Sequence, residues 1–190
     1  MRDAGKSDSA DLARLVNLAG EGLPLYLWRQ MAGGGEDPWE IGRERAARDS
    51  GGFSFRNSVV AEVGGKVAGA IIGYPITAEP EAIDSTNTPA MFVPLLELEN
   101  LAAGTWYINA VAVFPEARGL GVGSKLMRWA EQRASELGLR GPSLIVSDAN
   151  QGARRLYERL GYKEVARRPM ISEQWENAGK FWVLMIRDLL

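Results

Sequence analysis

The sequence predicts a mixed α/β fold, in which a β-sheet is flanked by helices. The C-terminal half alternates β-rich apolar runs with segments of helical spacing, and the N-terminal half predicts helices followed by a strand pair. Size is the third observation: 190 residues, 46% of them apolar and 24% charged, are enough for one domain to close its own core. We therefore expect a single domain over residues 1–190.

The N-terminal part predicts three helices and then a hairpin. Two β-rich runs, residues 57–63 and 66–76, meet at Gly64-Gly65, a pair that favours a tight turn between antiparallel strands. Before them, apolar residues recur at helical spacing in three segments, the first opened by Asp or Ser and the last two separated by three glycines. These segments are residues 8–18, 23–31 and 38–48.

The remaining elements begin with a turn-rich stretch, residues 77–88, and a helix over 89–101. Together they form a helical insertion at about 77–104. Because a helix then joins the strands at 106–114 and 143–147, these two strands should be parallel neighbours. The elements after the insertion are predicted in the order strand 106–114, helix 121–137, strand 143–147, helix 150–160, and an antiparallel strand pair at 162–171 and 180–188.

The composition excludes several classes of mechanism, because the chain has no Cys and no His. Disulfides, thiol nucleophiles and His-based dyads are ruled out. A metal would need oxygen ligands alone, and no run of Asp and Glu has that spacing, so we expect no metal. No secretory signal is visible, and the longest apolar stretches fall well short of the ~18 residues of a membrane span. We expect a soluble cytoplasmic protein without a membrane partner.

The net charge of −2 hides an asymmetry along the chain. Residues 1–115 carry 9 basic and 15 acidic groups, whereas residues 116–168 carry 11 and 6. A basic segment can mark an anion site, nucleic acid included, or it can be a set of solvated helix faces. Because the total charge is negative, we expect no nucleic-acid partner.

A glycine-rich turn at residues 118–124 is the most informative segment. A predicted strand leads into it and a predicted helix follows, so backbone N–H groups and the helix dipole can bind phosphate oxygens there. The glycines do not have the spacing of the Rossmann or Walker motifs. The alternative is a strand-to-helix turn that needs only positive φ.

The turn does fit the pattern Arg118-x-x-Gly121-x-Gly123, and a second pattern follows it. Asn150 opens the next helix, Tyr157 lies two turns later, and Gly161-Tyr162 closes it. With both patterns in this order, the sequence resembles the GNAT superfamily of acetyl-CoA-dependent N-acetyltransferases. The resemblance implies a GNAT-like mixed, mostly antiparallel sheet with parallel central strands flanked by helices.

The resemblance also implies roles for individual residues. Asn150 would hydrogen-bond the coenzyme A arm. Tyr157 would protonate the departing thiolate, although its spacing also suits a core aromatic beside Leu156 and Leu160. Backbone groups of the strand would pair with the pantetheine arm, and the turn would hold the pyrophosphate. The strand residues are Val111, Ala112 and Val113, and the turn residues are Arg118, Gly119, Leu120, Gly121, Val122, Gly123 and Ser124.

The general base is the main departure from the family pattern. Many members carry Glu or Asp on the strand before the turn, whereas residues 106–110 here contain no carboxylate. Asn109 and Tyr107 could orient a water or an amine. Glu97 and Glu99 are candidate substitutes for the base, or else surface carboxylates, and a water chain to bulk solvent would also serve.

The acceptor site is expected, from the resemblance, near residues 20–51 and 172–179. Aromatic and acidic residues there suit a cationic amine, or they are exposed acids and core aromatics. The insertion at 77–104 could cover the site or form a homodimer contact. The residues in question are Tyr26, Trp28, Trp39, Trp175, Glu21, Glu36, Asp37, Glu40, Glu173 and Glu176.

The predicted function is an N-acetyltransferase that moves an acetyl group from acetyl-CoA directly to a primary amine of a small molecule or peptide. Direct transfer is expected because no Cys is present to carry a covalent acetyl group. The missing strand carboxylate leaves a second hypothesis, an acyl-CoA-binding regulatory module with little or no transferase activity.

Overall fold

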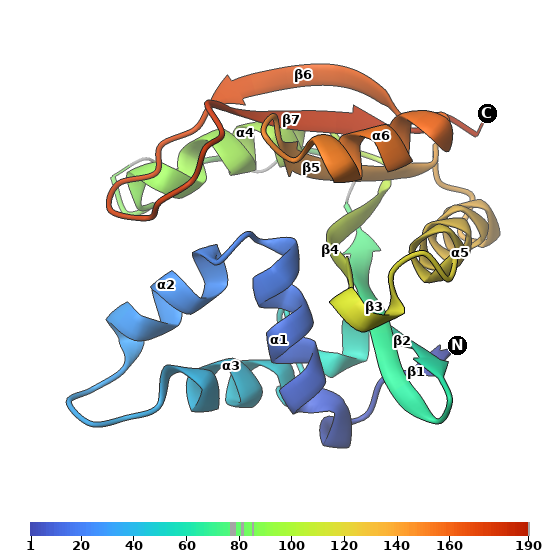
Figure 1. Ribbon diagram of the computed structural model, residues 1–190. Helices are drawn as coiled ribbons and strands as arrows, with labels where there is room; N and C mark the ends of the chain where they lie inside the picture. The colour runs from blue at the N-terminus through green and yellow to red at the C-terminus, as the bar shows by residue number, and fades with distance from the viewer. Residues whose placement is uncertain (77–78, 81, 85, 190) are drawn as a thin grey trace. The chain divides into compact units, whose positions relative to one another are not determined.

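The computed structural model describes residues 1–76, 79–80, 82–84 and 86–189 (Figure 1). They divide into two compact units, and neither unit is continuous in sequence. The first unit consists of Met1–Tyr74 and Asn109–Met127, and the second of Pro75–Ile108 and Arg128–Leu190. The single domain expected from the sequence stays a prediction, and each unit is described by itself.

The first unit contains the three predicted helices and the predicted hairpin. A short first strand pairs antiparallel with the second, and the second with the third. The hairpin turn has φ of 60° at Gly64 and 76° at Gly65, the left-handed conformation that a two-residue turn of this type requires. The elements are β1 (Arg2–Asp3), α1 (Ser9–Ala19), α2 (Leu23–Met31), α3 (Pro38–Ala46), β2 (Ser58–Val63), β3 (Lys66–Pro75), and parts of β4 (Trp106–Val113) and α5 (Val122–Glu136), with 3-10 turns at Lys6–Asp8, Phe55–Asn57 and Pro115–Ala117.

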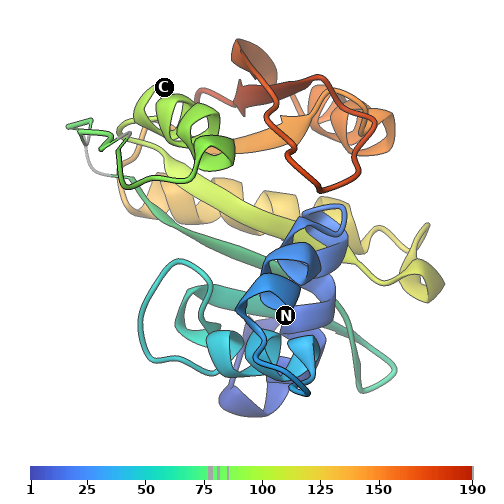
Figure 2. The ribbon, with the colours of Figure 1, turned by 90° about the vertical axis from the view of Figure 1, so that its left-hand side faces the viewer.

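The core of the first unit lies between these helices and one face of the strands. Alternate residues of β3, Ala70 and Ile72, point to the helices, as expected for a strand with one face on a core. β3 and β4 run next to each other in the sheet (Figure 2). They approach so closely that a Cβ added at Gly69 would lie 2.7 Å from the carbonyl oxygen of Ala112. The packing of β3 therefore fixes the position of the β4 segment that leads to the glycine turn.

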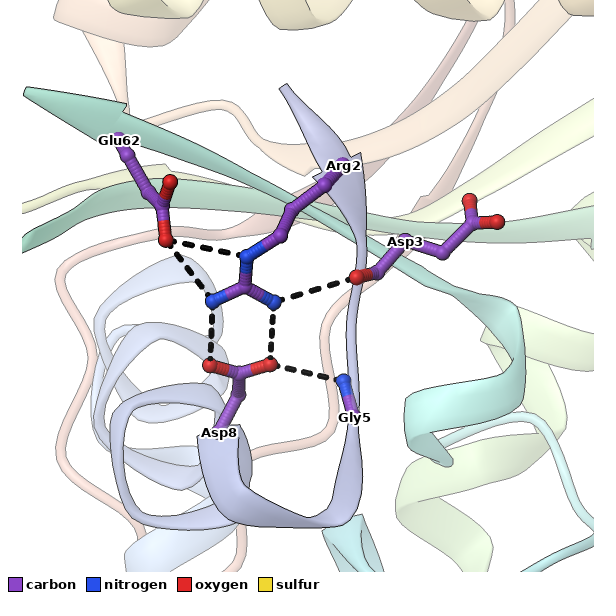
Figure 3. A network of polar contacts seen from close by, with 5 residues as sticks. All are labelled: Arg2, Asp3, Gly5, Asp8 and Glu62. Carbon is purple, nitrogen blue, oxygen red and sulfur yellow. Dashed lines mark hydrogen bonds and ion pairs between the residues drawn. The ribbon is translucent and has the colours of Figure 1, made fainter. Parts of the chain in front are cut away.

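An ion-pair network connects β1, the turn before α1 and β2 (Figure 3). The guanidinium of Arg2 donates to both carboxylate oxygens of Asp8, at 2.8 and 2.9 Å, and to Glu62 at 3.0 Å. The backbone N–H of Gly5 donates to Asp8 at 2.7 Å. The network thus connects the short first strand to the rest of the unit.

The second unit contains the predicted crossover and the closing strand pair. β4 and β5 are parallel, with Tyr107 opposite Ser143, while β5 pairs antiparallel with β7, and β7 with β6. Helix α4, from the insertion, contacts the three C-terminal strands. The elements are a 3-10 turn at Ala90–Phe92, α4 (Val93–Asn100), the remaining parts of β4 and α5, β5 (Pro142–Ser147), α6 (Gln151–Arg159), β6 (Lys163–Pro169) and β7 (Phe181–Ile186).

The strand order over the described residues is β1-β2-β3-β4-β5-β7-β6. The neighbours β4 and β5 are parallel, while β1–β2, β2–β3, β5–β7 and β6–β7 are antiparallel. This confirms the predicted fold class, a mixed, mostly antiparallel sheet with parallel central strands and flanking helices. Part of the stretch 77–88, predicted to be turn-rich, lies outside the described residues.

Candidate active site

The glycine turn lies in the first unit, between the end of β4 and the start of α5. Gly119 and Gly121 have φ of 80° and 75°, a conformation that glycine adopts without strain. A Cβ added at either position would meet no other atom within 4 Å. The glycines therefore serve the backbone conformation, and the space beside them stays open for a ligand.

The start of α5 supplies hydrogen-bond donors beside this open space. The N–H of Lys125 bonds to the carbonyl of Gly121 at 3.1 Å, the first bond of a helix of 15 residues. The amides of Val122, Gly123 and Ser124 precede that bond, and such first-turn amides have no partner within their own helix. Together with the helix dipole and the exposed Arg118, these amides are donors of the kind that bind phosphate oxygens, and the binding of pyrophosphate by this turn stays a prediction.

The strand before the turn carries Asn109, whose side chain is exposed. Its Nδ2 donates to the hydroxyl of Tyr74, near the end of β3, at 3.4 Å. The sequence patterns do not single out Tyr74. Its position near the end of a predicted strand was the available signal, but the insertion separates that strand from β4 in the chain. The last residues of β4, Val111–Val113, are half-buried.

The second signature lies in the second unit, on α6. Asn150 is the N-cap of this helix, and its Oδ1 accepts a hydrogen bond from the N–H of Ala153 at 3.2 Å. This bond leaves the Nδ2 of the amide as a donor. The cap explains the position of Asn150 in the fold, and its predicted bond to coenzyme A stays a prediction.

Tyr157 is buried on α6, with 7% of its surface exposed. Its ring lies against that of Tyr162, with centroids 6.0 Å apart and planes tilted by 49°. Burial and the neighbouring carboxylate of Glu131 raise the pKa of the Tyr162 phenol well above its ordinary value, so this second phenol stays protonated. Tyr157 is thus packed as a core aromatic, and its role as the proton donor remains a prediction.

The candidate bases of the insertion lie on α4, also in the second unit. Glu97 forms an ion pair with Arg168 of β6 at 2.5 Å, and Glu99 is half-buried two residues later. Tyr107, considered with Asn109 as a group that orients a water or an amine, is 4% exposed. The structure pairs Glu97 with a cation, and the role of both glutamates as bases stays a prediction.

Several aromatic and acidic residues of the predicted acceptor segments have local structural roles. Trp28 is 3% exposed, stacks on Phe53 and contacts Trp39 edge-on. A Cβ added at Gly42 would lie 2.6 Å from the Trp28 ring. Trp28 is therefore a core residue of the first unit. The acids nearby pair locally as well: Asp37 and Glu40 with Arg43, and Glu36 with the N–H of Gly33.

The loop between β6 and β7 is held by polar contacts within the second unit. Trp175 is buried and stacks on Trp182, with centroids 5.9 Å apart. Asp148 accepts hydrogen bonds from the backbone N–H groups of Lys180 and Phe181 at 2.8 and 3.2 Å. Although burial raises the pKa of the Asp148 carboxyl, these bonds outweigh that effect and leave the pKa below its ordinary value. Asp148, which directly follows β5, thus holds the start of β7 beside the end of β5.

Two further observations concern metal binding and membrane-spanning helices. Among the described residues, we find no cluster of three or more carboxylates that could hold a metal ion. Within the same part of the chain, every helix is too short or too polar to cross a membrane.

Comparison with known proteins connects this geometry to a family. A family model described as "Acetyltransferase (GNAT) family" matches residues 24–162. A crystal structure of an acetyltransferase has 23% identity and a TM-score of 0.67, covering 100% of this chain and 98% of its own. An N-acetyltransferase from Staphylococcus aureus Mu50 has 20% identity and a TM-score of 0.64, covering 98% of both chains.

A third structure, a GNAT family acetyltransferase from Elizabethkingia anophelis with acetyl-CoA bound, has 16% identity and a TM-score of 0.51. The match covers 70% of this chain and 75% of that one. At these identities, the structural matches establish the fold. The family model covers more than half of the chain, including the glycine turn and the α6 signature, and it establishes that the chain belongs to the GNAT family of acetyltransferases.

Proposed function

We propose that this protein transfers an acetyl group from acetyl-CoA directly to a primary amine of a small molecule or peptide. The geometry of the glycine turn is the observation that carries the proposal. Its left-handed glycines, the open space beside them and the first-turn amides of α5 suit the pyrophosphate of coenzyme A. The acetyl-CoA bound to the Elizabethkingia anophelis protein of the same family supports this choice of donor.

The chemistry requires a neutral amine and a proton for the leaving group. The amine nitrogen attacks the acetyl carbonyl, the carbon–sulfur bond breaks, and Tyr157 donates a proton to the departing sulfur. A thiol has a pKa of about 8.5 and a phenol of about 10, so the phenol is a suitable donor that solvent then reprotonates. After the attack, the positively charged nitrogen loses one proton to water. We propose direct transfer because the chain has no Cys that could carry a covalent acetyl group.

A charge placed in the turn tests the coenzyme A site. The change Gly121→Glu should weaken coenzyme A binding by more than about tenfold, because a carboxylate repels the pyrophosphate and the backbone at this position is left-handed. The matched control is Gly138→Glu, just after α5, where φ is 65° and the space around an added Cβ is equally open. Calorimetry measures both dissociation constants. Equal binding by the two variants would overturn the assignment of the turn.

The absence of a carboxylate in residues 106–110 favours one alternative, an acyl-CoA-binding regulatory module. The two functions differ in turnover. Release of the coenzyme A thiol from acetyl-CoA in the presence of a panel of amino acids, polyamines and peptide N-termini indicates the transferase. Tight coenzyme A binding without turnover on any of these amines would indicate the module.

A further inference from the structure

The last five residues of β4, 109–113, carry one polar side chain, that of Asn109. The hydroxyl of Tyr74 lies beside it. Asn109 donates to this hydroxyl through Nδ2 at 3.4 Å, and both residues belong to the first unit. Asn109 is exposed and Tyr74 half-buried, so the amide of Asn109 is open to solvent while the phenol is packed beside it. Asn109 stands on the strand where the family pattern leads one to expect a carboxylate, and Tyr74 reaches it from the neighbouring strand β3.

The loop before β2 fixes the other side of the Tyr74 ring. A Cβ added at Gly52 would lie 3.1 Å from both the hydroxyl oxygen and the ring carbon Cε1 of Tyr74, so the Gly52 backbone packs against the hydroxyl edge of the phenol. The side chain of Asn57 donates to the carbonyl oxygens of Gly51 and Gly52, at 3.0 and 3.4 Å. The Tyr74 hydroxyl therefore lies between Asn109 of β4 on one side and the hydrogen-bonded loop before β2 on the other.

The loop is also anchored from within. The hydroxyl of Ser54 is fully buried, donates to the carbonyl of Arg48 at 2.5 Å and accepts from the N–H of Arg56 at 3.1 Å. A loop held by these four side-chain hydrogen bonds keeps Gly52 in place against Tyr74.

We propose that Tyr74 is a positioning residue, which holds the amide of Asn109 so that its Oδ1 accepts a hydrogen bond from the nitrogen of the acceptor amine. An amide whose Nδ2 is engaged by a phenol has its carbonyl oxygen left as an acceptor. A neutral primary amine has two N–H bonds and one lone pair, so accepting one N–H turns the lone pair in a defined direction. No proton is removed at this step, because an amide is not a useful base.

This inference rests on the proposed function and deepens it, since it assigns the contact that orients the acceptor on a strand without a carboxylate. It also predicts which kinetic constant changes when Tyr74 is substituted. A group that orients the acceptor changes kcat/KM for the amine and leaves the affinity for coenzyme A unchanged.

Two substitutions perturb the hydroxyl in different ways. Tyr74→Phe removes it and should lower kcat/KM for the amine by about tenfold, the loss expected for one orienting hydrogen bond. Gly52→Ala keeps the hydroxyl but displaces the ring by a few tenths of an ångström, and should lower the same constant by less. The matched control is Gly5→Ala, whose added Cβ would meet only ordinary contacts, the nearest at 3.6 Å, and which should leave the constant unchanged.

A double-mutant cycle distinguishes positioning from a merely structural role. If Tyr74 acts through the amide, Tyr74→Phe should have no further effect on kcat/KM in an Asn109→Ala background. Full additivity of the two changes, or an unchanged kcat/KM for Tyr74→Phe alone, would overturn the inference. A wild-type protein that binds coenzyme A but acetylates no amine of the panel would overturn the proposed function, and this inference with it.

Discussion

The ion-pair network at the N-terminus allows a quantitative prediction about stability. Asp8 is 7% exposed, and its carboxylate accepts two hydrogen bonds from Arg2 and one from the N–H of Gly5 (Figure 3). The change Asp8→Asn keeps the shape of the side chain but removes its charge and turns an NH2 group toward a donor. A hydrogen bond to a charged group contributes about 1.5–3 kcal/mol, and the Arg2 side chain is partly exposed, so we expect a loss of about 2 kcal/mol.

Thermal unfolding measures this loss, and Asp3→Asn is its matched control. Asp3 is exposed and contacts Arg2 through its backbone carbonyl, so its carboxylate lies outside the network. For a chain of 190 residues, about 2 kcal/mol corresponds to a fall in Tm of roughly 4–8 °C. The control should stay within about 0.5 kcal/mol of the wild type. Equal melting temperatures for the two variants would refute the reasoning.

The same network predicts how the difference in stability between wild type and Asp8→Asn depends on pH. The hydrogen bond from Arg2, followed by that from Gly5, outweighs burial and lowers the pKa of the Asp8 carboxyl below its ordinary value. A lowered pKa contributes stability above the unfolded pKa of about 3.9, and this contribution is lost as the pH falls through the folded value. The difference between wild type and Asp8→Asn should therefore be constant at neutral pH and shrink in acid. A difference that does not begin to shrink as the pH falls below about 3.9 would refute the electrostatic cause.

Three further predictions concern the signature of α6 and its surroundings. Tyr157→Phe should lower kcat while coenzyme A affinity, measured by calorimetry, stays unchanged; an unchanged kcat would remove this phenol as the proton donor. Gly179→Ala should destabilise the fold by about 1–3 kcal/mol in thermal unfolding, because its Cβ would be 2.3 Å from the hydroxyl oxygen of Ser147. Asn150→Asp keeps an oxygen for the N–H of Ala153 but lacks the Nδ2 donor, so Tm should hold while coenzyme A binding weakens; unchanged binding would restrict Asn150 to its capping role.

The elements of the fold could be predicted closely because their signals are local. Helical spacing of apolar residues located α1, α2 and α3 to within two residues at each end. Glycines located turns and helix ends, since Gly64, Gly65, Gly138 and Gly161 all have the positive φ for which glycine is favoured. The parallel pairing of β4 with β5 followed from the crossover helix between them, a rule of connection that needs no knowledge of distant residues.

The candidate site could be predicted only where it is built from one continuous segment. The turn at residues 118–124 carries its own signal, because strand, glycines and helix start follow one another in the chain. The contact between Tyr74 and Asn109 has no such signal: 34 residues separate the two, and the register between their strands depends on packing at positions such as Gly69. The ion pair of Glu97 with Arg168 is hidden for the same reason, since it joins α4 to β6 across most of the second unit's sequence. Side chains that act through such contacts have to be found in the folded structure, and the acceptor-orienting pair proposed here belongs to that class.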